Sequence, residues 1–215
     1  NAANSIATIG AATAASIGSL SLVNNRDLTI GSVTVNAVAY NVLNSTGTVS
    51  ITANSNSTTT AITSAVAMSA NSLSLNGTST TATTVVSLTG AITINAGGSN
   101  LSVTANNSIN QTGAITLAAN TSGTASAVTY DTTSGNRTST IKSGALTVSA
   151  GSNNSIDYLI KTSGAAITTN GAISVPGSIT LDNTYGCTGT GCSPATGYIT
   201  AANAATLATT TLSGV

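Results

Sequence analysis

Aliphatic and hydroxyl residues alternate along most of this chain in short runs. The clearest run is GAITI at residues 90–94, and GAITL at residues 113–117 repeats it almost letter for letter. Each run starts with a turn-forming residue and a small residue, which aliphatic, hydroxyl and aliphatic side chains follow. Successive side chains of a β-strand point to opposite faces. Each run therefore predicts a short strand with one buried face and one solvent-exposed face.

The same phrase occurs six times along the chain. The other four copies are GTVSI at 47–51, NSLSL at 71–75, GALTV at 144–148 and GAISV at 171–175. The copies therefore follow one another at similar but unequal intervals. Repeats of about 20–50 residues are typical of solenoids, in which each repeat is one coil stacked on the last. We therefore predict an all-β fold, a parallel β-helix (β-solenoid), with the six phrases lying one over the next.

Residues 90–112 predict one complete coil. It consists of a strand at 92–94, a turn at 95–98, a strand at 101–103, a turn at 106–107, and Ile109 leading back to the next phrase. The dense alternation from residue 18 to residue 35 predicts more strands of the same solenoid, with turns at Asn24, Asn25 and Gly31, since Asn and Gly tolerate left-handed backbone angles. At about 4.8 Å per coil, about eight or nine coils of irregular length give a rod on the order of 40 Å long.

The whole chain, residues 1–215, is predicted to be a single solenoid segment. Neither end shows the charges, the proline or the covering element that protect exposed strand edges. We therefore expect the segment to belong to a longer chain or to an end-to-end assembly.

Composition restricts both the core and the chemistry. The chain has no Phe, Trp, His or Glu, and its four Lys and Arg residues balance four Asp residues. The core must therefore be thin and built from Val, Ile, Leu and Ala. Nucleic-acid binding requires clustered basic residues, and the four here are scattered, so no nucleic-acid partner is expected. No apolar run approaches the roughly 20 residues of a transmembrane helix, so no membrane span is expected.

The candidate catalytic groups are the aspartates Asp27, Asp131, Asp157 and Asp182. Polysaccharide-cleaving β-helices need grouped carboxylates, and the nearly equal spacing of Asp131, Asp157 and Asp182 would allow these residues to stack on successive coils. Solvated turn residues are the alternative interpretation. Without His there is no Ser-His-Asp triad and too few ligands for a metal site. We predict no catalytic residue, no metal and no cofactor, with a polysaccharide-binding or polysaccharide-cleaving β-helix as an alternative.

Cys187 and Cys192 are separated by four residues, and Gly186, Gly189 and Gly191 make that loop flexible enough to close. We predict a structural disulfide between them, which implies an oxidising compartment outside the cytosol. Two free thiols without a role are the alternative.

The longest repeat starts at Gly113, and its surplus lies at residues 121–140. Insertions in a solenoid map to loops on one face, which is often the binding face. The candidate ligand contacts are Tyr130, Asp131 and Arg137 in this stretch, Tyr158 on the next coil, and Tyr185 in a second loop at 183–198. The tyrosines are candidates for stacking on sugars, or alternatively for filling the corners of coils. A regular threonine ladder of the ice-binding type is disfavoured, because Thr positions do not recur in register along the sequence.

Residues 103–117, VTANNSINQTGAITL, with the related phrases at 144 and 171, resemble the repeats of filamentous-haemagglutinin-type proteins. The resemblance covers about residues 45–185. Members of that family are large, secreted, right-handed parallel β-helices, exported by two-partner secretion or as autotransporters in Gram-negative bacteria. The resemblance implies a right-handed coil and a cell-surface or released fibre used in adhesion, biofilm formation or contact-dependent interaction. It supplies no catalytic residue.

These observations together predict an extracellular, non-catalytic structural or adhesive segment at a bacterial cell surface. The expected partners are a glycan or protein on a host or neighbouring cell, or copies of the chain stacked end to end. A self-stacking subunit of an extracellular filament is the alternative function.

Overall fold

The computed structural model describes residues 4–10, 17–56, 58–96, 99–118 and 126–132, followed by the strands between residues 141 and 213. Side chains are described in the first four ranges and at residues 128–132. The described part is all-β. Its strands are β1 (Thr8–Ile9), β2 (Leu20–Asn24), β3 (Leu28–Ile30), β4 (Val33–Val35), β5 (Val38–Tyr40), β6 (Leu43–Asn44), β7 (Thr48–Ser55), β8 (Ile62–Ser64), β9 (Met68–Ala70), β10 (Ser72–Ser79), β11 (Thr84–Leu88), β12 (Ile92–Ile94), β13 (Leu101–Ala105), β14 (Ser108–Gln111), β15 (Ile115–Leu117), β16 (Ser126–Asp131), β17 (Ile141–Ser143), β18 (Leu146–Val148), β19 (Ile156–Lys161), β20 (Ile167–Thr169), β21 (Ser174–Asp182), β22 (Ile199–Ala201) and β23 (Thr206–Ser213).

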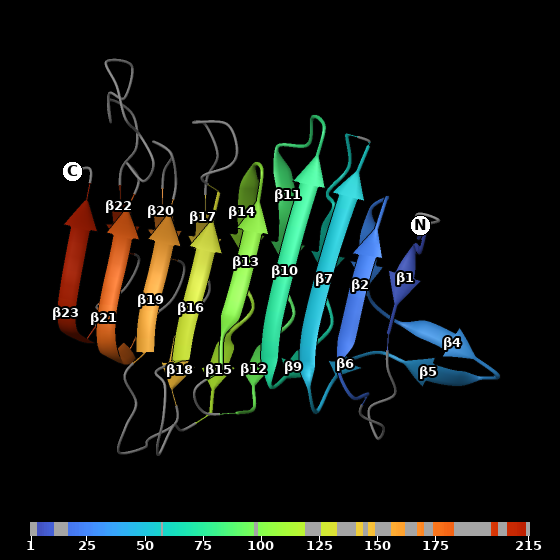
Figure 1. Ribbon diagram of the computed structural model, residues 1–215, viewed down its shortest axis with the longest axis horizontal. Helices are drawn as coiled ribbons and strands as arrows, with labels where there is room; N and C mark the ends of the chain where they lie inside the picture. Colours follow the sequence, from blue (N-terminus) through green and yellow to red (C-terminus); the bar gives the residue numbers. More distant parts are fainter. Residues whose placement is uncertain are drawn as a thin grey trace.

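Three parallel sheets form the walls of a coil. The front sheet has the order β2-β7-β10-β13-β16-β19-β21-β23, the back sheet β1-β3-β8-β11-β14-β17-β20-β22 and the base sheet β18-β15-β12-β9-β6. From β7 to β20 the chain visits front, back and base in turn, so that β10 returns beside β7 and β13 beside β10 (Figure 1). This is a parallel β-solenoid, with about four turns in the part whose side chains are described. The count of eight or nine coils stays a prediction.

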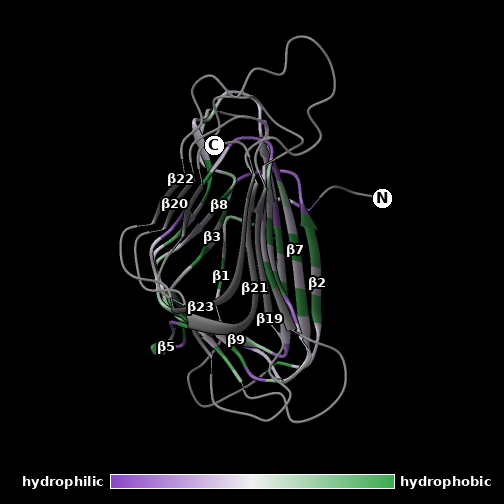
Figure 2. Cartoon of the chain, turned by 90° about the vertical axis from the view of Figure 1, so that its left-hand side faces the viewer, coloured by the Kyte–Doolittle hydropathy of each residue, from purple (hydrophilic) through white to green (hydrophobic). Residues whose placement is uncertain are grey.

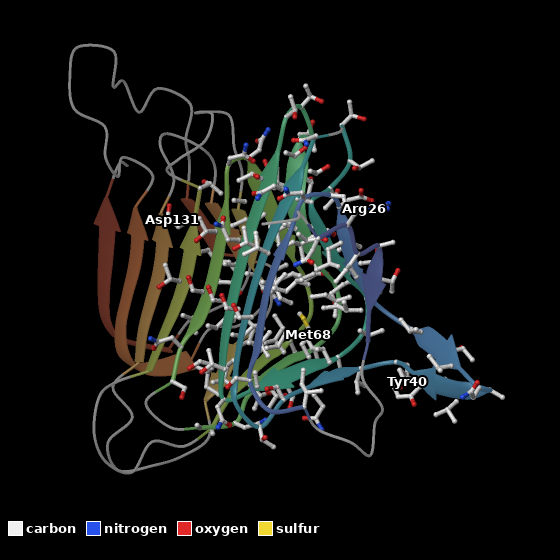
Figure 3. All side chains as sticks on the ribbon, turned by 45° about the vertical axis from the view of Figure 1, so that its right-hand side comes forward. Arg26, Tyr40, Met68 and Asp131 are labelled. Carbon is white, nitrogen blue, oxygen red and sulfur yellow. The ribbon has the colours of Figure 1, made fainter. Side chains whose placement is uncertain are left out.

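Figure 2 looks along the stack and shows the front and back sheets as two facing walls, joined below by the base sheet. The space between them is filled by columns of aliphatic side chains, one from each coil. The base sheet contributes the column Leu43, Met68, Ile92 and Ile115, of which each member is at most 3% exposed. Figure 3 shows Met68 inside the coil. The predicted core of Val, Ile, Leu and Ala is therefore confirmed for most of the described part, and Met68 and Tyr130 are the exceptions.

The stacking of the phrases is confirmed for some copies and wrong for others. The phrases at 90, 113 and 144 form β12, β15 and β18, which stack in register in the base sheet. The phrases at 47 and 71 instead lie in β7 and β10 of the front sheet. The phrase at 171 leads into β21, also in the front sheet. Alternation specifies which face of a strand is buried, but it does not specify which side of the coil the strand occupies.

The glycines that open the base-sheet phrases are required by close packing of backbones. A Cβ atom at Gly90 would collide with the backbone of Val66, and one at Gly113 would collide with the carbonyl of Gly90. Neither glycine has a left-handed φ angle. Their role is thus to let consecutive coils approach, rather than to form a left-handed turn.

Asparagine side chains extend the backbone ladder between coils. The Asn106 amide accepts a hydrogen bond from the Ser79 N–H at 3.0 Å and donates one to the Ser79 carbonyl at 2.9 Å. Fully buried Asn24 makes the same pair of bonds with Ile6, at 2.8 and 2.9 Å. A primary amide has one acceptor and two donors in the geometry of a peptide group. These asparagines therefore replace a missing peptide at a coil corner, where the sequence predicted turns.

Residues 33–40 depart from the predicted solenoid. β4 and β5 pair antiparallel, with Val33 opposite Tyr40 and Val35 opposite Val38. The connecting residues Asn36 and Ala37 have φ angles of 50° and 64°. Positive φ at both central positions is the geometry of a type I′ turn, whose twist matches that of a hairpin. The prediction that this stretch adds a strand to the solenoid is wrong: Figure 1 shows the hairpin projecting from the N-terminal end of the stack.

Candidate binding surface

The outward face of the front sheet carries polar residues in aligned rows. One row contains Ser21, Ser50, Ser74, Ser102 and Thr129. The next row contains Val23, Thr52, Asn76, Thr104 and Asp131. These residues are half-buried or exposed, because the inward positions between them fill the core. Hydroxyl groups of serine and threonine thus recur in register along the first row.

The rows become regular only after folding because the coils differ in length. Leu73 pairs with Val49 of the preceding coil and with Leu101 of the following coil, and the second step along the chain is longer than the first. The extra residues lie in the corners, so the strands remain aligned. Adjacent strands are about 4.8 Å apart, and residues of one strand on the same face are about 6.7 Å apart. The front sheet therefore presents a rigid grid of small polar groups.

Hydrogen bonds fix some of these side chains to their neighbours on the next coil. Thr78 Oγ1 donates to Asn54 Oδ1 at 2.7 Å on the front sheet. On the base sheet, Ser69 Oγ donates to Asn44 Oδ1 at 2.9 Å and accepts from Asn95 Nδ2 at 2.9 Å. Side chains held in this way have less rotamer entropy to lose when a ligand binds.

A shallow hollow of about 230 Å³ lies over the base sheet. It is lined by Val42, Leu43, Asn44, Ala67, Met68, Ser69 and Thr93. Its lining has no charged group, and neither His nor Cys. Nothing in this lining provides a general acid, a general base or a nucleophile activated by one.

Charge is almost absent from these surfaces. Between β2 and β13 the described front-sheet strands carry no charged residue, and Asp131 on β16 is the first. The ion pair between Arg26 Nε and Asp27 Oδ1, at 3.6 Å, lies at a corner of the coil, and both side chains are close to half exposed. Figure 3 places Arg26 far from the hairpin residue Tyr40.

The register does not stack the aspartates as their spacing suggested. Asp157 pairs with Ala127, whereas Asp131 pairs with Lys161, which in turn pairs with Asp182. Asp157 is thus four positions along the strand from the row that contains Asp131. The stacked trio that the spacing allowed does not form, since Lys161 occupies the middle position of that row.

The predicted ligand contact Tyr130 lies in the core. Its side chain is fully buried and continues the column Leu22, Ile51, Leu75 and Val103. The Tyr130 hydroxyl donates to Gln111 Oε1 at 3.0 Å, and the amide of buried Gln111 donates to the Gly113 carbonyl. Tyr130 therefore fills the interior of a coil from within strand β16, rather than a corner, and it is not on the surface where sugars would stack.

Of the other predicted ligand-contact residues, only Asp131 and Tyr158 lie within the described part of the chain. Half-exposed Asp131 is on the outward row of the front sheet. Tyr158 pairs with Val128, at the register position of the column formed by Val49, Leu73 and Leu101. Arg137, Tyr185, Cys187 and Cys192 lie outside the described residues, so their contacts and the disulfide stay predictions.

Among the described residues, no three His, Cys, Asp or Glu side chains gather in a way that would hold a metal ion. The same part of the chain contains no helix of the length and hydrophobicity needed to cross a bilayer. No protein-family model, curated protein or solved structure matches this chain.

Proposed function

We propose that this chain is a non-catalytic, extracellular β-solenoid segment that attaches a cell surface or a matrix to a neighbouring surface. The observation that carries the proposal is the grid of aligned Ser, Thr and Asn side chains on the front sheet. Such a face offers many hydrogen-bond donors and acceptors at fixed spacing, but no group that performs chemistry. It suits weak contacts that are repeated along an extended partner.

The absence of charge from the front sheet between β2 and β13 indicates the chemistry of that partner. A polyanion such as nucleic acid gains affinity from Lys and Arg contacts, and the front-sheet rows from β2 to β13 contain neither. A neutral, hydroxyl-rich polysaccharide fits this face better, since neutral hydrogen bonds are its main means of recognition. The attraction should then depend little on salt, because screening acts on charges.

The finer parts of the proposal come from the sequence. The resemblance of residues 103–117 to filamentous-haemagglutinin-type repeats supports a right-handed coil, a secreted fibre and a bacterial cell surface. Cys187 and Cys192 support an oxidising compartment if they form a disulfide. A total of eight or nine coils follows if each of the eight strands of the front sheet belongs to a coil of its own.

An adhesion assay tests the proposal. Beads coated with the chain are counted after washing on plates that carry dextran, as a neutral polysaccharide, or cultured bacterial cells. We expect retention above that of uncoated beads on at least one of these surfaces, and little change between low and high salt. Retention equal to that of uncoated beads on both would contradict an adhesive role.

Two variants locate the contact. Ser74→Glu with Ser102→Glu places two charges side by side on the front sheet, and Thr63→Glu with Ser87→Glu does the same on the back sheet. Burying an unpaired charge under a ligand is costly, so we expect the front pair to lower retention about tenfold or more. The back pair is the matched control. If both pairs act equally, the front sheet is not the contact.

Electron micrographs of the same material distinguish the alternative function. Short, separate rods agree with an adhesive segment that acts singly. Ordered filaments built end to end would favour the structural fibre instead. Release of reducing ends from a neutral polysaccharide by the purified chain would favour the polysaccharide-cleaving alternative.

A further inference from the structure

Exposed large hydrophobic side chains are confined to one end of the described solenoid. They are Ile6, Val23, Val35 and Val38, with exposed fractions of 37%, 56%, 50% and 51%. All four precede β6 in the chain, whereas the described coils from β6 to β15 expose none. Val35 and Val38 belong to the projecting hairpin.

The hairpin has one apolar face. Residues directly opposite each other in an antiparallel pair share a face, so the pairs Val33–Tyr40 and Val35–Val38 lie on one side, and Thr34–Ala39 on the other. Val33 and Tyr40, at the base, are half-buried, while Val35 and Val38 next to the turn are exposed. A sheet face of this composition normally packs against something else, and two strands alone are marginally stable in water.

The base of the hairpin is fixed to the solenoid. A Cβ atom at Gly10 would collide with the carbonyl of Gly31, and it would lie 2.6 Å from the carbonyl of Tyr40. The first coil therefore packs directly against both ends of the hairpin. Figures 1 and 3 show the arm standing away from the stack. A face presented in a fixed direction requires less ordering when it binds.

We propose that the hairpin β4–β5 packs face to face with the hairpin of a second copy of this chain. A two-fold axis would set Val35 of one copy over Val38 of the other, so that one apolar face covers its equivalent. Charge favours this partner: residues 33–40 carry none, the whole chain has zero net charge, and proteins near zero net charge associate readily. A strongly charged partner would gain nothing from this face.

The size of the face sets the strength of the contact. A stable interface involves about 20–30 residues from each partner, and the hairpin from Val33 to Tyr40 supplies eight. The pair of copies is therefore weak in dilute solution. It becomes important where many copies are held on one surface, because tethering raises their effective concentration. The contact is lateral, so it does not depend on the adhesive role or on end-to-end stacking.

Sedimentation equilibrium of the full chain over a wide range of concentration tests the proposal, with the variant Val35→Thr/Val38→Thr beside it. Threonine keeps the β-branched shape but places a hydroxyl where the face must be apolar. We expect reversible dimers of the wild-type chain, and a dissociation constant about tenfold or more higher for the variant. Circular dichroism and the thermal midpoint should be unchanged, because the two valines contribute nothing to the solenoid core.

Val23→Thr is the matched control. This valine is exposed to a similar extent but lies on the front sheet, and its replacement should leave the dissociation constant unchanged. A wild-type chain that stays monomeric up to millimolar concentration would overturn the proposal. So would dimers that persist equally in the Val35→Thr/Val38→Thr variant, or that weaken equally in Val23→Thr.

Discussion

The base-sheet strand β12 and the hairpin strand β4 have almost the same sequence pattern and opposite environments. β12 reads Ile92-Thr93-Ile94, and β4 reads Val33-Thr34-Val35. Both isoleucines of β12 are fully buried, whereas Val35 is half exposed. The difference is in their neighbours, because β12 lies between β9 and β15 while β4 pairs only with β5. Alternation thus gives a strand one apolar face, but that face is buried only where strands of neighbouring coils pack on either side.

The two strands are also stabilised in different ways. In the stack, each aliphatic side chain contacts the equivalent side chain of the coil on either side, and burial contributes about 1.5–3 kcal/mol for a residue of this size. The hairpin is ordered instead by its turn and by the close packing of Gly10 against the carbonyls of Gly31 and Tyr40. Substitutions of equal chemistry should therefore have very different effects in the two regions.

The largest difference is expected from removing aliphatic groups. Ile92→Ala leaves a cavity between Met68 and Ile115 and should lower the free energy of unfolding by about 4 kcal/mol. Val38→Ala, on the half-exposed hairpin face, should lower it by less than about 0.5 kcal/mol. Urea titration followed by circular dichroism measures both. Similar losses would mean that the hairpin belongs to the cooperative core after all.

A smaller loss is expected from adding one methyl group between coils. Gly113→Ala directs a Cβ at the carbonyl of Gly90 and to within 2.9 Å of the carbonyl of Thr89, and backbone cannot move aside as a side chain can. We expect a loss of about 3 kcal/mol. Gly18→Ala is the control, since nothing lies within 4 Å of the new Cβ. The same urea titration applies, and a neutral Gly113→Ala would show that the coils are not in close contact there.

The smallest effect is expected at the hairpin turn, and it should stabilise. Ala37 has a φ of 64°, which costs a residue with a Cβ about 1 kcal/mol, and glycine avoids that cost. Ala37→Gly should therefore slow hydrogen exchange of the amides in residues 33–40, measured by mass spectrometry on that peptide. The urea midpoint of the solenoid should stay the same. Faster exchange in the variant would contradict the turn geometry.

Much of the solenoid was predictable because it is local. Within residues 90–112 the strands predicted at 92–94 and 101–103 lie in β12 and β13, whereas Ile109, which was predicted only to lead back to the next phrase, lies in a third strand, β14. The stacking of the phrases at 90, 113 and 144 was predictable as well, since they recur at the interval of one coil. The placement of the phrases at 47 and 71 in the front sheet was not predictable, because the same five-residue pattern fits any of the three sheets.

The candidate surface was less predictable, since it depends on register. Ser50, Ser74 and Ser102 are separated by unequal stretches of chain, and only the pairing of β7, β10 and β13 aligns them. The same dependence on register set Lys161, and not Asp157, beside Asp131. The alternation Val128-Thr129-Tyr130 places Tyr130 on the same face of its strand as Val128, but it does not show that this face is buried. Its inward position follows from pairing with Val103, which lies on the preceding coil.

By itself, the sequence determined that this protein is all-β, nearly uncharged and built from stacked coils, because alternation, composition and the recurrence of one phrase are properties of the chain that need no partner strand. Only the tertiary structure decided which phrase lies on which wall, which hydroxyls form rows, and that residues 33–40 leave the stack as an arm. Those outcomes depend on contacts between residues a full coil apart in the sequence, where the coil corners absorb unequal lengths of chain and the register is set by close packing between neighbouring coils.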